Sequence, residues 1–294
     1  MSAAPEALLS PMNVWHAWEW SPFITIPLTL GALWYALGVA AVWHSAGPGR
    51  GMGFRDVGCF ATGWVVLALA LLSPLHPLSE VLFSAHMVQH ELMMVVAAPL
   101  LVLGRPLVPF VWAMPPHWRR TVGDVATTPQ FRRGWSLLTR PSTAFILHAA
   151  AIWIWHAPGL YDATLESDVV HTLQHVSFLS TALLFWWTML HGARSTRGAS
   201  VAYLFATMLH TGALGVILAF TSALWYPAYA TTTTTWGMTA LDDQQLGGLV
   251  MWIPGGITYL VASLVLFALW MRESESRARV RENLAAQLRT VGAT

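Results

Sequence analysis

The sequence has no lysine, a single cysteine and little charge of either sign: only 10% of its 294 residues are Asp, Glu, Lys or Arg. The lone cysteine, Cys59, excludes internal disulfides and any cysteine-rich metal site. Soluble domains carry about 25% charged residues, so this chain cannot cover a water-facing surface. Its net charge of +1 gives no indication of nucleic-acid binding.

The sequence instead has abundant apolar residues, which make up 55% of the chain and include 17 tryptophans. Crossing the hydrocarbon core takes about 20 mainly apolar residues, and tryptophan gathers where lipid meets water. We therefore predict an all-α integral membrane protein, a bundle of about seven transmembrane helices forming one polytopic domain over residues 1–294. The expected spans are 23–43, 58–73, 79–103, 142–155, 169–191, 199–223 and 246–271, followed by a cytoplasmic tail at 272–294.

All 15 basic residues are arginines, and they fall into alternate loops of this scheme. They lie between the first and second, third and fourth, and fifth and sixth spans, and after the seventh. The loops on the other side carry acidic residues and no arginine. By the positive-inside rule the N-terminus is outside and the C-terminus is in the cytoplasm. An even number of spans would have mixed the two classes of loop.

Two histidine pairs stand out near the starts of the third and fifth spans. His86 and His90 are four residues apart, and so are His171 and His175, so each pair lies on one face of its helix with a rise of about 6 Å. Both spans run inward, which places both pairs in the outer leaflet. His156 closes the fourth span at the same surface, where His76 and Asp243 are also expected.

Neutral imidazole is a ligand for copper, zinc, iron and nickel, so two pairs at one depth indicate a metal site. By helical phase Met93 continues the face of the first pair, and its thioether would favour cuprous copper. Histidines that only form hydrogen bonds between helices are the simpler alternative. Two pairs together with His156 favour a metal or haem site, because ionisable residues within membranes are usually functional.

Glu91 is expected near the middle of the bilayer, where a carboxylate costs roughly 2.5–3.5 kcal/mol on insertion scales. We expect it to be protonated or paired with His148 or His210, either as a proton relay or as a structural pair. In the seventh span, the segment GGLVMWIPGG at 247–256 predicts close helix packing or a kink.

Three segments resemble the multi-span CtaG family of cytochrome c oxidase assembly factors, of the Bacillus type: HMVQHELMMVVAAPLLVLGRP (86–106), WHAPGLYDATLESDVVHTLQHVSFLSTALLFWW (155–187) and LDDQQLGGLVMWIPGG (241–256). The resemblance implies a non-enzymatic role in making a haem–copper oxidase functional, usually by supplying copper. It implies oxidase subunits as partners and the bacterial cytoplasmic membrane as the location. The positions that match the family pattern are His86, His90, His156, His171, His175 and Asp243.

The resulting hypothesis is a membrane protein that binds copper near its outer face and helps to metallate an oxidase. Three alternatives remain at this stage. A membrane cytochrome would use the histidines as axial haem ligands. A di-iron hydroxylase also has such histidine pairs, but on the cytoplasmic side. A metal-free assembly scaffold would tolerate the loss of the histidines.

Overall fold

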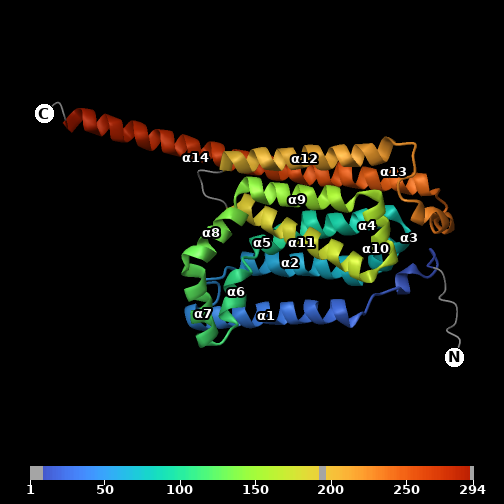
Figure 1. Cartoon of the computed structure of the whole chain (residues 1–294). Helices are drawn as coiled ribbons and strands as arrows, with labels where there is room; N and C mark the ends of the chain where they lie inside the picture. Colours follow the sequence, from blue (N-terminus) through green and yellow to red (C-terminus); the bar gives the residue numbers. More distant parts are fainter. Residues whose placement is uncertain (1–8, 192–196, 292–294) are drawn as a thin grey trace.

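The computed structural model describes residues 9–191 and 197–291, which form helices joined by turns, with no strand among them. Figure 1 shows the long helices lying side by side in one bundle, with α1 along one edge and α12 and α14 along the opposite edge. The all-helical prediction is confirmed.

Within the described residues, five stretches are long and apolar enough to cross a membrane. They are α1 (Pro22–Ala46), α2 (Phe54–Leu72), the helix series Phe83–Leu103, α12 (Arg197–Phe220) and the series Ala240–Glu282. A sixth is obtained if α8 (Pro129–Leu138) and α9 (Pro141–Trp155), which meet at 59°, count as one broken span. The 24-residue α11 (Asp168–His191) is not among them, so the predicted count of seven is not confirmed.

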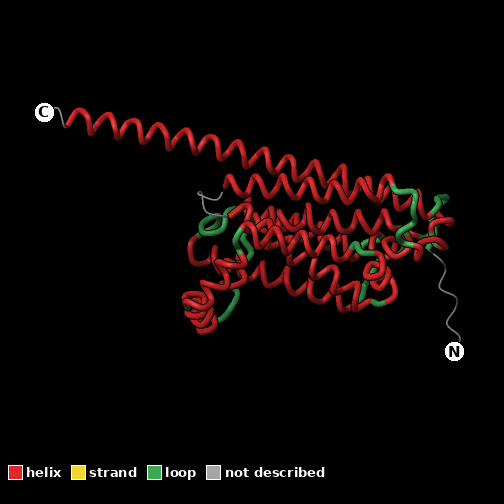
Figure 2. The backbone as a smooth tube through the Cα atoms, turned by 45° about the horizontal axis from the view of Figure 1, so that its top comes forward, coloured by secondary structure: helices red, strands yellow, loops and turns green. Residues whose placement is uncertain are grey.

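Shorter helices gather at the two ends of the bundle (Figure 1). The end near the N-terminus holds α3 (Leu75–Val81), α10 (Pro158–Glu166) and α13 (Ala240–Val250). The chain also forms the 3₁₀ turns η1 (Val14–His16), η4 (Pro227–Thr231) and η5 (Thr233–Trp236). The other end holds α6 (Leu107–Trp112), α7 (Pro116–Thr127) and α8. The last helix, α14 (Gly256–Val291), continues past the bundle without a break (Figure 2), so the predicted tail is helical up to Val291. Residues 292–294 of that tail lie outside the described residues.

Two of the predicted spans contain breaks that the sequence pattern did not indicate. The third begins at Phe83 rather than Ser79, because extended backbone at Leu82 (φ −133°, ψ 125°) separates α3 from α4 (Phe83–Glu91). It then passes through a π-helical segment, η2 (Leu92–Ala97), into α5 (Ala98–Leu103). In the seventh span a π-helical segment with an internal proline, η6 (Met251–Gly255), joins α13 to α14. This break lies within the GGLVMWIPGG segment where a kink was predicted.

Close helix contacts depend on glycines that face a neighbouring backbone. A Cβ added at Gly248 would lie 2.7 Å from the carbonyl oxygen of Gly215, and one added at Gly215 would lie 2.8 Å from the carbonyl oxygen of Gly248. This reciprocal contact joins α12 to α13 at a distance that no side chain permits. The close packing predicted for 247–256 is therefore present.

Buried apolar side chains form two clusters on opposite sides of the helix series Phe83–Leu103. One cluster includes Phe83, Met87, Phe178 and Met251 and extends into α9, α11, α12 and α14. The other includes Met93, Tyr35 and Phe60 and lies against α1 and α2. The series thus forms the centre of the bundle and is the most buried of the five apolar stretches.

Candidate metal centre

The two predicted histidine pairs come together at the start of α4 and of α11. Within each pair the imidazoles approach through Nε2: His86 and His90 at 3.0 Å, His171 and His175 at 3.1 Å. Two nitrogens bound to one tetrahedral ion at about 2.0 Å would be about 3.3 Å apart. Each pair therefore has a spacing close to that of two ligands on one ion.

The pairs also face each other across the helix interface. The His86 ring stacks on that of His171 with centroids 5.2 Å apart, and the His90 ring is 5.3 Å from that of His175. Nitrogens of His86, His171 and His175 all lie within 4.8 Å of one another, and all four residues of this histidine cluster are buried. The predicted convergence of the two pairs is thus present in the fold.

Neighbouring groups hold the His86 ring in an orientation suited to metal binding. Its Nδ1 lies 3.3 Å from the carbonyl oxygen of Ser79, to which it can donate. The Tyr229 hydroxyl donates to the same carbonyl at 3.0 Å, and it is 3.0 Å from the Tyr161 hydroxyl. On the other side Gln174 brings its Oε1 to 3.2 Å from Nε2 of His86. The turn η4, which carries Tyr229, thereby closes over the cluster.

Two buried glutamines, Gln89 and Gln174, belong to the site and were missed by the sequence analysis. Gln89 donates to the Ala70 carbonyl at 2.8 Å and approaches His76 Nδ1 at 3.0 Å. Burial lowers the pKa of His76, which suits a neutral ring that accepts from Gln89. The signal was available, because both histidine pairs read H-x-x-Q-H, at 86–90 and 171–175. A glutamine at this position points toward the opposite pair or its neighbours.

His76, which the sequence analysis left outside the ligand set, lies beside the cluster. Its ring stacks on that of His171 with centroids 5.5 Å apart and lies 6.3 Å from that of His175. It is not one of the three residues whose ligand atoms converge. His76 therefore forms part of the wall of the site.

Asp243, predicted as a ligand, has a different position. Its carboxylate accepts hydrogen bonds from the backbone N–H of Phe83 at 2.6 Å and of Ser84 at 3.1 Å, and from the Ser84 hydroxyl at 2.5 Å. It therefore caps the N-terminus of α4, where a negative charge also complements the helix dipole. The adjacent Asp242 instead caps its own helix with Thr239. The structure gives Asp243 the task of fixing α4 three residues before His86.

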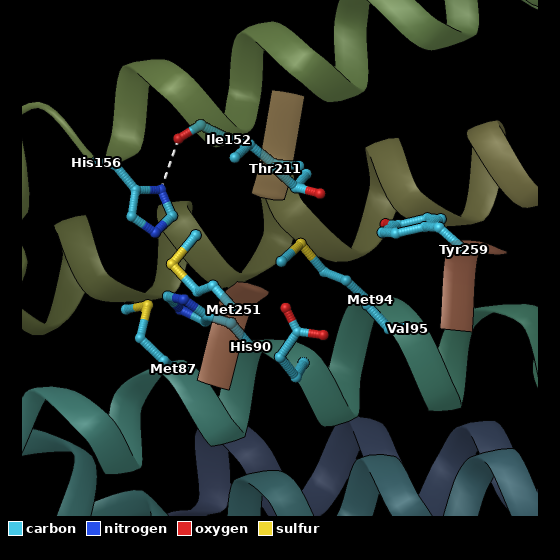
Figure 3. A pocket seen from close by; sticks show the side chains of 10 residues that line it. Met87, His90, Met94, Val95, Ile152, His156, Thr211, Met251 and Tyr259 are labelled. Atoms are coloured by element: carbon cyan, nitrogen blue, oxygen red, sulfur yellow. Dashed lines mark hydrogen bonds between the residues drawn. The ribbon is translucent and has the colours of Figure 1, made fainter. Parts of the chain in front are cut away.

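His156 is at the C-terminal cap of α9, as predicted, with its ring 6.5 Å from that of His90. Both side chains line a cavity of about 10 Å³, roughly the space of one water molecule, together with Met87, Met94 and Met251 (Figure 3). The remaining lining residues are Glu91, Val95, Ile152, Thr211 and Tyr259. We call this space the methionine cavity.

Met93, the predicted soft ligand, does not line this cavity but packs in the cluster against α1 and α2. The cause is the π-helical segment η2, which begins at Leu92. Its i→i+5 hydrogen bonds widen the turn, so the face of His90 continues to Met94 and Val95 rather than to Met93. The phase prediction for Met93 assumed a regular α-helix.

Of the two alternatives predicted for Glu91, protonation or pairing with His148 or His210, the pairing is not found, because both histidines have other partners. His148 approaches the hydroxyls of Thr181 at 3.2 Å and Tyr259 at 3.4 Å, and His210 accepts from the indole of Trp153 at 3.2 Å. Across the described residues neither histidine is hydrogen-bonded to Glu91. Glu91 lies against Gly255, where an added Cβ would be 2.8 Å from its carboxylate.

Comparisons with known proteins agree with the motifs. The cytochrome c oxidase caa3 assembly factor family, CtaG, matches residues 33–273. An uncharacterised protein of Mycobacterium leprae is 25% identical over 237 residues, covering 76% of this chain and 35% of its own length. Uncharacterised proteins of Mycobacterium bovis and Mycobacterium tuberculosis are each 24% identical over 286 residues, covering 92% of this chain and 42% of theirs.

The chain thus spans less than half the length of these curated relatives. No solved structure matches it. The family match extends from the first long helix into the last and includes every histidine of the cluster. On this evidence the chain belongs to the CtaG family of cytochrome c oxidase caa3 assembly factors.

Proposed function

We propose that this protein binds copper at the histidine cluster and passes it to a haem–copper oxidase during assembly. One observation carries the proposal: the nitrogens of His86, His171 and His175 converge within 4.8 Å in a buried site. Family membership supplies the oxidase as the recipient. The protein would act in the bacterial cytoplasmic membrane, with the cluster toward the extracytoplasmic side and oxidase subunits as its partners.

The chemistry required is ligand exchange rather than catalysis. Neutral imidazoles bind copper without adding charge to the site, and each can be replaced by a ligand of the recipient. The groups around His86 support this role, since a ligand imidazole usually donates its other N–H to a carbonyl. The cluster lies at the end of the bundle, near the turns through which an ion would leave.

A haem is a poorer fit for these residues. The His86 and His171 rings stack at 5.2 Å, so a porphyrin could enter between them only if α4 and α11 moved apart. A metal ion needs no such movement. This difference favours copper over the cytochrome alternative.

The test is a His171→Ala/His175→Ala double variant in cells that make the oxidase. We expect oxidase activity to be lost at limiting copper and to recover, at least in part, when copper is in excess, because free metal bypasses a missing delivery site by mass action. Alanine favours helix, so α11 should still form.

The matched control is His44→Ala/His191→Ala, which removes two exposed histidines, one of them at the far end of α11. It should leave oxidase activity unchanged at every copper level. Membrane levels of both variants must equal those of the wild type. Full activity of the His171/His175 variant at scarce copper would defeat the proposal and favour a metal-free scaffold.

A further inference from the structure

The methionine cavity is lined by imidazole and thioether side chains of the kind that bind soft metal ions, and it is distinct from the convergent nitrogens of His86, His171 and His175. Two buried imidazole nitrogens beside it, Nδ1 of His90 and Nε2 of His156, have no hydrogen-bond partner among the described residues. Such buried, unpaired polar atoms are rare in folded proteins and need an explanation. Both side chains line the same small cavity.

The ring of His156 is fixed in the form that a metal requires. Its Nδ1 lies 2.7 Å from the carbonyl oxygen of Ile152, and this bond, drawn in Figure 3, holds the proton on Nδ1. Nε2 therefore keeps its lone pair, and the His156 side chain is only 3% exposed. A hydrogen bond from the second nitrogen to a carbonyl is the usual arrangement around a ligand imidazole.

The rest of the lining is soft. Figure 3 shows the sulfur atoms of Met87 and Met251 beside the rings of His90 and His156, with Met94 further along the cavity. Thioether and imidazole together favour cuprous copper over harder metals. All four ligands are neutral, and a monovalent ion costs less to desolvate than a divalent one.

Glu91 lines the same cavity, and its carboxyl group can supply the balancing negative charge by releasing a proton when a cation binds. Gly255 leaves room for its carboxylate, because any side chain there would overlap it. A buried carboxylate that pairs with neither His148 nor His210 thereby acquires a function. A site with one cation and one carboxylate is electrically neutral as a whole, which lowers the cost of burial.

The geometry points to a cuprous ion site in the methionine cavity, formed by His90, His156, Met87 and Met251. It deepens the proposed function, on which it rests, by adding an inner holding position behind the converging triad. His90 connects the two, because its Nε2 is 3.0 Å from that of His86 while its Nδ1 is the unpaired atom.

The test uses purified full-length protein, loaded with cuprous ion under anaerobic conditions and washed free of loosely bound metal. Copper per chain is measured, and X-ray absorption reports the atoms bound to it. We expect two ions in the wild type, with sulfur as well as nitrogen in the ligand shell. The Met87→Leu/Met251→Leu variant should drop to one ion and lose the sulfur signal.

Two further variants make the outcomes distinct. Met93→Leu replaces an equally buried methionine outside the cavity and should retain two ions and the sulfur signal. A His86→Ala/His171→Ala/His175→Ala variant should retain one ion with sulfur ligands. Leucine and methionine have similar volumes, so the double variant should fold. The sulfur signal of the wild type tests the site without any substitution, whether or not the variant folds.

Copper bound by the wild type without sulfur ligands would overturn the inner site and leave the proposed function standing; the cavity would then hold a water. The same conclusion follows if Met87→Leu/Met251→Leu binds as many ions as the wild type. Absence of copper from wild-type protein would instead remove the proposed function together with the inner site.

Discussion

Replacement of Asp243 with alanine is expected to destabilise the folded protein while leaving the histidines able to bind copper. The carboxylate is fully buried and accepts three hydrogen bonds at the N-terminus of α4, two of them from backbone N–H groups. The Ser84 hydroxyl can rotate to another acceptor, whereas the two N–H groups cannot. They would remain buried without a partner.

The two lost backbone bonds set the size of the effect. A hydrogen bond to a charged group contributes about 1.5–3 kcal/mol, so the two lost bonds should lower the stability by about 3–6 kcal/mol. Asp242→Ala is the matched control, since the neighbouring carboxylate is exposed and accepts hydrogen bonds only from Thr239, at the start of its own helix. That change should cost about 1 kcal/mol.

Thermal unfolding of the purified proteins in detergent measures the stability, and elemental analysis of copper per folded chain measures the copper binding. We expect Asp243→Ala to unfold at a clearly lower temperature than Asp242→Ala and to bind as much copper as the wild type. Loss of copper at unchanged stability would refute the capping argument and make Asp243 a ligand, as the sequence motif first implied.

Further predictions concern orientation and packing. A reporter fused after Thr294 should read cytoplasmic and one inserted within Thr231–Thr235 extracytoplasmic; the reverse would place the histidine cluster on the cytoplasmic side. Gly248→Ala should separate α12 from α13 and cost about 1–3 kcal/mol in an unfolding measurement, because the new Cβ would lie 2.5 Å from a backbone nitrogen of α12. Trp186→Phe should cost about 1–3 kcal/mol, because the indole donates at 2.9 Å to the carbonyl of Met94 within the π-helical segment; unchanged stability would mean that this carbonyl has another partner.

Much of the fold was predictable because the bilayer restricts the choices. Six of the seven expected spans overlap helices that are long and apolar enough to cross a membrane, or half of the bent pair α8–α9. The seventh, α11, forms a helix at the expected place but is not among these apolar helices. Low charge and long apolar runs specify helices in lipid, since every backbone group must be satisfied internally. The breaks at Leu82 and in η2 were not predictable, because they depend on neighbours such as Asp243 and Trp186 that are distant in sequence.

The candidate site shows the same division. Residues at i and i+4 lie on the same face of a helix, so the sequence by itself determined that His86 shares a face with His90, and His171 with His175. It also carried the repeated H-x-x-Q-H pattern. Which residues surround those histidines depends on helix phase over longer distances and on contacts between helices.

The tertiary structure alone decided that Asp243 caps α4 and that Met93 packs in the cluster against α1 and α2, while Met87 and Met251 line a cavity with His90 and His156. The physical reason is that the cap and the cavity both bring together residues of different helices, and that a π turn shifts the phase of the side chains that follow it. A periodic pattern records which residues share a face of a regular helix. Only the packed bundle determines where that regularity is interrupted and what each face meets.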